Sequence, residues 1–436
     1  YTTLFRSMVT EETIDKSVIR LMNTRMKLGM FDDPTNVPFA KIPYEENDSK
    51  EHLELALDVS RKTMVLLKNE DNILPLDKNK IKSIAVIGPN ANSRDALIGN
   101  YYGTSSKYVT VLEGLQQVVN QDTRVYYAQG CHLFKDKVEN LAMPEDRIAE
   151  AVSVAQRSDV VVMCLGLDAN IEGEEGDDSN AQAGGDKMDL NLPGLQQKLL
   201  EEVYKTGKPI ILVLLSGSAL AINWADEHIP AIVQAWYPSA QGGKAIASLI
   251  FGEYSPSGKL PVTFYKSTQE LPDFEDYAMK NRTYRYMENE ALYPFGYGLS
   301  YSKFEYSNLR ISKSEIEINE TINLSVTVKN IGEYEGDETV ELYLKDVDAT
   351  VVIPKYQLKG IKKVCLKPSE EKEVSFELTS RQMALINDEG KCILEPGLFE
   401  VFVGGSQPDK RSKELTGDCM QKSTFNVKGE SIVLEY

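Results

Sequence analysis

The spacing of apolar residues changes part-way along the chain, and this change constrains the fold more than any other feature. Between about residues 51 and 265, continuous apolar runs such as Val160-Val161-Val162 alternate with segments of helical periodicity. Continuous runs of Val, Ile and Leu are typical of strands that are covered on both faces, as in a parallel sheet. The pattern therefore predicts an α/β domain with a mostly parallel sheet.

The individual elements of this domain can be assigned from the same pattern. The expected strands are residues 83–88, 124–128, 159–165, 209–215, 230–236 and 260–265. The expected helices are residues 111–120, 144–157, 193–206 and 241–251. Residues 266–308 are rich in Tyr, Gly and Pro, and we expect them to form a connecting arm.

Beyond about residue 309 the apolar residues recur with a period of two. Ile322, Leu324, Val326 and Val328 alternate with polar residues, and similar runs follow near 340, 374 and 399. Turn residues such as Glu395-Pro396-Gly397 separate these runs. Short alternating strands with this punctuation predict that residues 309–436 form an antiparallel β-sandwich of roughly immunoglobulin size.

Residues 1–34 are expected to be helical and to end abruptly. Thr10 is a suitable N-cap, and an apolar face follows it. This face comprises Ile14, Val18, Leu21 and Met22. An isolated helix cannot bury such a face, so we expect this segment to be the tail of a preceding domain, with 35–50 as a linker. The chain starts at Tyr1 without a methionine, which suggests that its start is a cut.

The composition argues against several classes of function. Lys and Arg number 48 against 66 Asp and Glu, and a net charge of −18 disfavours nucleic-acid and anionic-membrane surfaces. No apolar run approaches the roughly 18 residues that a membrane helix needs. The three histidines are far apart, which disfavours a histidine-rich metal site but leaves carboxylate catalysis open.

The five cysteines lack CxxC spacing and favour a reducing compartment. We therefore expect a cytoplasmic location, while a secreted or periplasmic one stays open because the start looks truncated. The turn Gly88-Pro89-Asn90 follows an expected strand but matches neither phosphate-binding pattern, so no nucleotide or other cofactor is expected.

An acidic, glycine-rich segment at residues 166–189 is the strongest candidate for chemistry. Its acidic cluster comprises Glu172, Glu174, Glu175, Asp177 and Asp178. The segment leaves the carboxyl end of an expected parallel strand, where open α/β sheets place their ligand sites. Crowded like charges raise the pKa of a carboxyl group, and a carboxyl group still protonated near neutrality can act as a general acid.

Plainer interpretations of this region remain. An acidic loop is often a solvated surface loop or a casual cation site, although the spacing does not fit an EF-hand and no metal is expected. Trp236 and Tyr237 end an expected strand at the same edge of the sheet. These aromatic side chains could stack on a sugar, or they could be buried between domains.

Several motifs in a fixed order resemble those of glycoside hydrolase family 3. They are Val65-Leu66-Leu67-Lys68-Asn69, Leu74-Pro75-Leu76, Glu172-Gly173-Glu174-Glu175, Gly185-Asp186-Lys187, Arg282-Thr283-Tyr284-Arg285-Tyr286 and the block from Tyr293 to Tyr301. Residues after 309 resemble the fibronectin type III-like domain of the family. Residues 1–34 resemble the end of its TIM-like catalytic barrel, so the rest of that barrel is expected outside this chain.

The resemblance implies part of a retaining, exo-acting β-glucosidase or β-xylosidase. In the family, an Asp on the barrel attacks the sugar, and a Glu on the second-domain loop is the acid/base. The implied partners are a glycoside or oligosaccharide substrate and the barrel, as an upstream segment or a separate chain. A homo-oligomer stays open.

The acid/base Glu has three candidates, which we rank Glu174, Glu175 and Glu172. A paired-Glu alignment favours Glu174, and a Glu-Gly-x-Asp alignment favours Glu175, because an insertion before Gly185 allows both. A function of a different class is a non-catalytic carbohydrate-binding or scaffold fragment.

Overall fold

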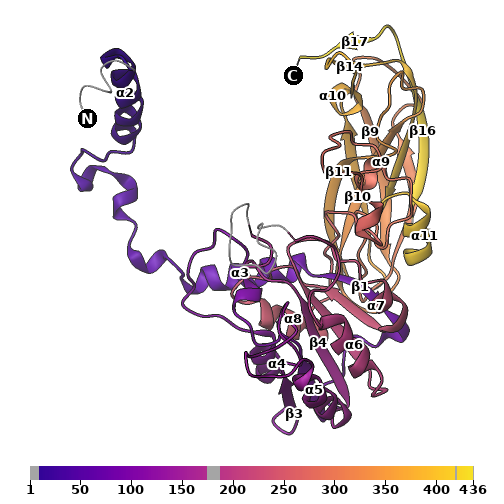
Figure 1. Ribbon diagram of the computed structural model, residues 1–436. Coiled ribbons are helices and arrows are strands. Elements are labelled where there is room, and N and C mark those ends of the chain that lie inside the picture. The colour runs from indigo at the N-terminus through magenta and orange to yellow at the C-terminus, as the bar shows by residue number, and fades with distance from the viewer. Residues whose placement is uncertain (1–8, 174–186, 418–419, 436) are drawn as a thin grey trace. The chain divides into compact units, whose positions relative to one another are not determined.

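The computed structural model describes residues 9–173, 187–417 and 420–435 (Figure 1). The chain divides into two compact units, Tyr1–Leu55 and Ala56–Tyr436.

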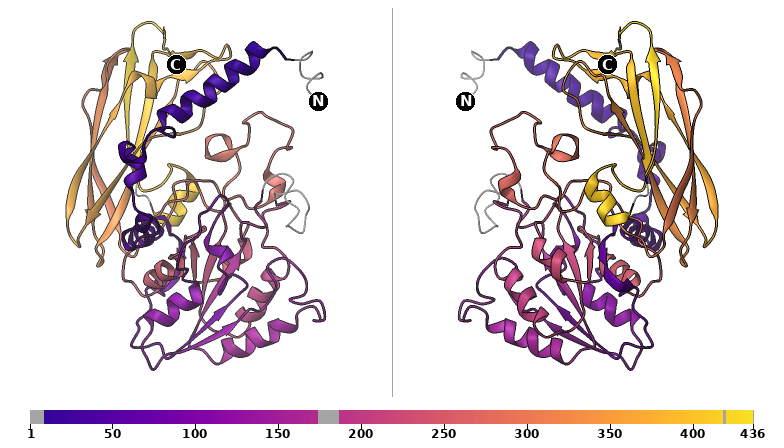
Figure 2. Two further views of the ribbon diagram at one scale, coloured as in Figure 1. Left: turned by 90° about the vertical axis from the view of Figure 1, so that its left-hand side faces the viewer. Right: turned by 90° about the vertical axis from the view of Figure 1, so that its right-hand side faces the viewer.

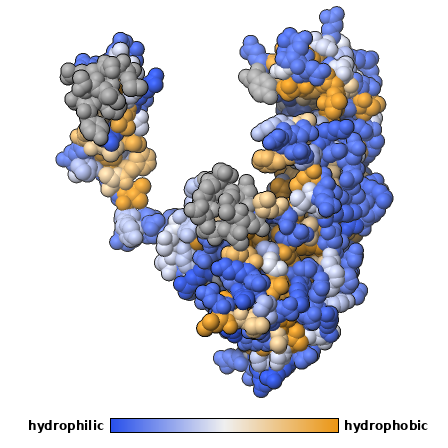
Figure 3. Space-filling view, viewed as in Figure 1, coloured by the Kyte–Doolittle hydropathy of each residue, from blue (hydrophilic) through white to orange (hydrophobic). Residues whose placement is uncertain are grey.

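The first unit contains the predicted N-terminal helix, α2 (Glu11–Lys27). The Thr10 hydroxyl accepts a hydrogen bond from the Thr13 amide at 3.3 Å, which confirms the predicted N-cap. Every residue of α2 is exposed, including the apolar face, and apolar side chains are visible on this part of the surface in Figure 3. Three 3₁₀ helices follow: η1 (Pro34–Asn36), η2 (Pro38–Lys41) and η3 (Tyr44–Glu46).

The second unit begins with a six-stranded sheet in the order β1-β6-β5-β4-β2-β3. Its strands are β1 (Val65–Asn69), β2 (Ser83–Ile87), β3 (Arg124–Ala128), β4 (Val160–Gly166), β5 (Ile210–Leu215) and β6 (Ala231–Gln234). All neighbouring strands are parallel except β1, which pairs antiparallel with β6. The mostly parallel sheet is thus confirmed, and its antiparallel edge strand was not predicted.

Helices cover both faces of this sheet (Figure 2). They are α3 (Lys50–Thr63), α4 (Val111–Val118), α5 (Asp146–Gln156), α6 (Gln196–Tyr204), α7 (Asn223–His228) and α8 (Gly242–Ile250). Alternate residues of β2 enter different cores: Ile84 packs with residues of α4 and α8, whereas Ala85 packs with residues of α5 and α6. The central strands β2, β4 and β5 are buried on both faces, which explains why they are continuous apolar runs in the sequence.

The predicted strand at 260–265 is wrong. Pro261 has no amide hydrogen to give to a sheet. The amides of Leu260 and Phe264 instead donate to the carbonyls of Tyr297 and Tyr293, at 2.9 Å each. Leu260 and Phe264 are therefore buried under the connecting arm, whereas Val262 between them is exposed, and one isolated bridge joins Phe264 to Tyr293. The arm also holds the short helices η6 (Thr268–Glu270) and α9 (Thr283–Tyr286).

The remaining described residues form the predicted β-sandwich, whose strand pairs are antiparallel apart from one parallel pair at the edge of the larger sheet. One sheet has the order β11-β10-β15-β16-β8, and the facing sheet has the order β12-β9-β7. The strands are β7 (Phe304–Ile311), β8 (Glu315–Glu317), β9 (Ile322–Asn330), β10 (Gly336–Asp346), β11 (Gln357–Leu366), β12 (Glu371–Leu378), β15 (Gly397–Gly404) and β16 (Gln421–Lys428). The alternating burial of β9 confirms the period of two.

Smaller elements complete the sandwich. A third sheet comprises β13 (Leu385–Ile386), β14 (Cys392–Leu394) and β17 (Ile432–Val433), and the helices are α10 (Ser380–Met383) and α11 (Lys410–Thr416). Two further 3₁₀ helices, η4 (Glu70–Asn72) and η5 (Asp95–Leu97), lie in the α/β domain. Among the described residues, no helix is long and apolar enough to cross a bilayer.

Candidate active site

The acidic segment leaves the sheet at Gly166, the last residue of β4. The backbone φ of Gly166 is +132°, and an added Cβ would lie 2.1 Å from the Leu215 carbonyl oxygen, so only glycine fits. The fully buried Gln196 side chain accepts a hydrogen bond from the Gly166 amide at 2.7 Å and donates to its carbonyl at 2.8 Å. The point at which the segment departs is therefore fixed by α6.

The next residues are held one after another. Asn90 donates to the Leu167 carbonyl at 2.6 Å, and Asp168 accepts from the amides of Asn170 and Ile171 at 3.0 and 3.3 Å. Burial raises the pKa of Asp168, and its hydrogen bonds with Asn170 and Ile171 oppose that rise. Hydrogen bonds thus hold the residues of the segment that lead to the first glutamate, Glu172.

The carboxylate of Glu172 accepts hydrogen bonds from three donors. The Gly217 amide donates to it at 2.6 Å, and the hydroxyls of Ser218 and Tyr237 donate as well. Asn100 donates to the Glu172 carbonyl at 2.8 Å. Gly217 and Ser218 follow β5, and Tyr237 follows β6, so Glu172 joins its own segment to the ends of two other strands.

The two aromatic candidates, Trp236 and Tyr237, have different surroundings. Trp236 has a φ of +58°, donates from Nε1 to the Thr63 carbonyl at 3.1 Å, and meets Phe264 edge-on. Burial and the neighbouring Glu172 raise the pKa of Tyr237, so its phenol is the hydrogen-bond donor to that carboxylate. Sugar stacking by these two rings stays a prediction.

Glu174 and Glu175, the first two candidates for the acid/base, lie outside the described residues. The described chain resumes at Lys187, whose ammonium group donates to the Ala219 carbonyl at 2.7 Å. Burial lowers the pKa of Lys187, and attraction to Glu172 and Asp189 opposes that effect. Lys187, Gln196 and Ser218 were not singled out from the sequence as functional. Lys187 lies in the Gly185-Asp186-Lys187 motif, whereas Gln196 and Ser218 lie in none of the motifs.

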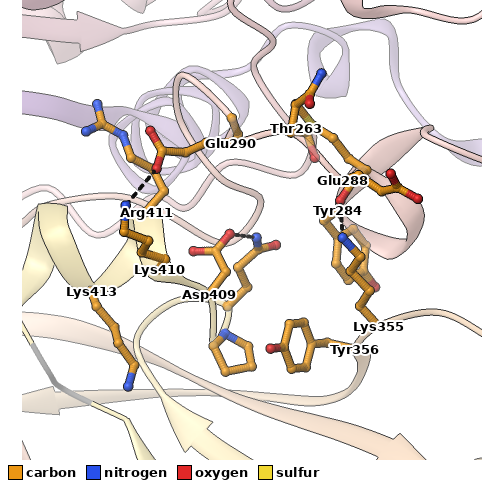
Figure 4. Close-up of a pocket in the computed structure, with 15 residues that line it drawn as sticks. Thr263, Tyr284, Glu288, Glu290, Lys355, Tyr356, Asp409, Lys410, Arg411 and Lys413 are labelled. Atoms are coloured by element: carbon orange, nitrogen blue, oxygen red, sulfur yellow. Dashed lines mark hydrogen bonds and ion pairs between the residues drawn. The ribbon is translucent and has the colours of Figure 1, made fainter.

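A separate pocket, of about 530 Å³, lies between the connecting arm and the β-sandwich (Figure 4). Its charged side chains are largely paired: Lys410 lies 3.7 Å from Glu290, and Lys355 donates to the Met287 carbonyl at 2.6 Å. Tyr356 also lines it. The Oε1 of Gln407 has no hydrogen-bond partner within the described residues, but this atom is fully buried and is not accessible from the pocket.

In the described part of the chain, no three or more His, Cys, Asp or Glu side chains are placed to hold a metal ion.

Comparison with known proteins decides the family. Residues 64–301, more than half of the chain, match the glycosyl hydrolase family 3 C-terminal domain. The chain belongs to glycosyl hydrolase family 3. Residues 338–407 of this family 3 chain match the fibronectin type III-like domain.

Relatives of the family 3 chain are glycosidases. It is 37% identical over 428 residues to a beta-xylosidase of Formosa agariphila, covering 95% of this chain and 57% of that protein. It is 35% identical to a periplasmic beta-glucosidase of Salmonella typhimurium, covering 91% and 54%. A solved β-glucosidase from Erythrobacter marinus has a TM-score of 0.81 at 32% identity, covering 98% and 57%. The chain thus spans little more than half the length of these relatives.

Proposed function

We propose that the chain is part of a retaining, exo-acting β-glycosidase that removes terminal β-D-glucosyl or β-D-xylosyl residues. The observation that carries this proposal is the anchoring of the acidic segment at the carboxyl edge of the parallel sheet, through Gly166, Asp168 and Glu172. Ligand sites of open α/β sheets lie at this edge. The names of the two curated relatives support both sugars as substrates.

The proposed mechanism divides the work between two carboxyl groups. A loop Glu donates its proton to the departing glycosidic oxygen while an Asp on a barrel outside these residues attacks the anomeric carbon. The same Glu, now a carboxylate, takes a proton from water, and that water releases the sugar. Retention requires the two carboxyl groups to lie about 5–5.5 Å apart, so the loop must reach toward the barrel.

Glu174 is our first choice for the acid/base and Glu175 the second. Both oxygens of Glu172 already accept hydrogen bonds from the α/β domain, which makes this residue the weakest of the three. A general acid must instead present its proton to the substrate.

The test is complementation with a barrel. The chain alone should not hydrolyse 4-nitrophenyl β-xyloside or β-glucoside, whereas the chain joined to or mixed with a family 3 barrel should. If the same barrel hydrolyses these substrates equally well when it is paired with an unrelated α/β domain, the proposal is contradicted.

The second candidate function is non-catalytic carbohydrate binding, and the pocket in Figure 4 favours it. Its size suits a small ligand, and Tyr356 offers an aromatic ring on which a sugar can stack. Calorimetric titration of the chain alone with xylobiose or cellobiose tests this candidate. Binding that is lost in Tyr356→Ala supports it, and the absence of heat with either sugar contradicts it.

A further inference from the structure

Both described ends of the acidic segment are tied to the same turn, residues 216–220, which follows β5. At the first end, Glu172 accepts hydrogen bonds from Gly217 and Ser218. At the second end, Lys187 donates to Ala219. Residues that lie 15 positions apart in the sequence therefore hold adjacent residues of one turn.

The turn is shaped to receive the Glu172 carboxylate. A Cβ added to Gly217 would lie 3.0 Å from the Glu172 Oε2 and 2.9 Å from the Cε2 of Tyr237. Both side chains can approach the backbone of residue 217 this closely because it is a glycine. Its amide points at the carboxylate. Hydrogen bonds to an ionised acceptor are stronger than those between neutral groups.

The charges of the two ends complement each other. Lys187 is largely withdrawn from water and is attracted to Glu172, while its hydrogen bond goes to a carbonyl. Burying either charge without the other would be costly. Both described ends of the segment, at Glu172 and at Lys187, are consequently held against the turn at residues 216–220.

We propose that Glu172 is a positioning residue that, with Ser218, Tyr237 and Lys187, fixes the two described ends of the acidic segment at the turn after β5. This inference rests on the proposed function, because it assigns the acid/base role to another Glu of that segment. Glu172 acts through the turn, because its carboxylate accepts hydrogen bonds from Gly217, Ser218 and Tyr237 of the same domain.

The positioning role can be tested on this chain by hydrogen exchange. In Glu172→Ala the amide of Gly217 loses its acceptor, so hydrogen exchange at this amide should become at least about tenfold faster. The exchange rates of the amides in residues 167–173 and 187–192 should also rise. Tyr237→Phe should give a smaller change in the same amides. Tyr301→Phe is the matched control, because it removes a part-buried hydroxyl bond to the Leu249 carbonyl elsewhere in the domain. Unchanged exchange in Glu172→Ala would overturn the proposal.

Kinetics in a barrel-containing enzyme separate positioning from catalysis. Glu172→Gln should lower kcat by a similar factor for activated and poor leaving groups and should leave the pH profile unshifted. Azide should not restore activity to Glu172→Ala; restoration would show that Glu172 is the acid/base and overturn the inference. If Glu174→Ala and Glu175→Ala are both fully active, the proposed function fails, whereas the exchange result stands.

Discussion

The hydroxyl of Tyr237 donates a hydrogen bond to the carboxylate of Glu172, 65 residues earlier in the chain. Tyr237 follows β6 and Glu172 follows β4, with β5 between these two strands in the sheet. The contact therefore spans three neighbouring strand ends. It links an aromatic residue that the sequence offered as a candidate for sugar stacking with the glutamate that we ranked last as the acid/base.

Gly217→Ala should loosen this contact. The new methyl group would lie within about 3 Å of both Tyr237 and Glu172, so one of them must move. We expect faster tryptic cleavage after Lys187, whose side chain is otherwise held by Ala219. Gly103→Ala is the control, because nothing lies within 4 Å of its added Cβ. Equal cleavage rates in the two variants would count against the prediction.

Gln196→Ala should destabilise the α/β domain. The substitution removes three hydrogen bonds, to both polar groups of Gly166 and to the Leu133 carbonyl, at a fully buried position. Leaving buried groups unpaired beside a cavity costs about 2–4 kcal/mol. Urea unfolding measures the loss. Gln197→Ala, which removes one bond to Glu201, should cost less than about 1 kcal/mol.

The fold was predictable where local pattern decides it. The run at Val160–Gly166 is apolar throughout because both faces are buried, and β9 alternates because only one face is. β1 was not predicted, since its partner β6 lies about 165 residues later and the pairing is antiparallel. The strand predicted at 260–265 is absent because Leu260 and Phe264 hydrogen-bond to and pack against the connecting arm rather than within a sheet.

The candidate site was predictable only in outline. Composition and position identified the acidic segment, but the donors to Glu172 come from Gly217, Ser218 and Tyr237, on other strands. Contacts between distant loops depend on strand order, which a single sequence does not reveal. The hydrogen bond from Lys187 could not be predicted either, because its acceptor is a backbone carbonyl, that of Ala219, in a distant loop.

The stability of the β-sandwich should depend on pH through Glu341. This side chain is 2% exposed, and burial raises its pKa from 4.5 to about 7, with Tyr343 and Lys259 opposing and Glu338 reinforcing the rise. Between pH 4.5 and 7 the folded state keeps a proton that the unfolded state releases, so stability falls as pH rises through this window. The expected loss is on the order of 3 kcal/mol.

Urea unfolding at pH 4.5 and pH 8 tests this dependence. Between these two pH values the unfolding free energy of Glu341→Gln should fall by about 3 kcal/mol less than that of the unsubstituted protein, because the amide does not titrate. The exposed Glu373→Gln should behave like the unsubstituted protein. A pH response that is the same in all three proteins would rule out Glu341 as the cause.

Arg411→Ala should weaken the junction between the β-sandwich and the α/β domain. Arg411 lies 3.2 Å from Asp226 and donates to the Leu292 carbonyl at 3.2 Å, and both side chains of the ion pair are about four-fifths shielded from solvent. Losing hydrogen bonds to a charged partner costs about 1.5–3 kcal/mol. In thermal unfolding, Arg411→Ala should have a lower Tm than Lys410→Ala, because Lys410 is 81% exposed and its ion pairs contribute little to stability.

We propose that the acidic segment supplies the acid/base of a retaining β-glycosidase. The most direct measurement is the product formed with azide by Glu174→Ala and Glu175→Ala in a barrel-containing enzyme. One variant should lose at least about 100-fold in kcat on a poor leaving group, and azide should restore turnover on an activated one and yield the β-glycosyl azide by NMR. Full activity of both variants, with no glycosyl azide from either, would contradict the account.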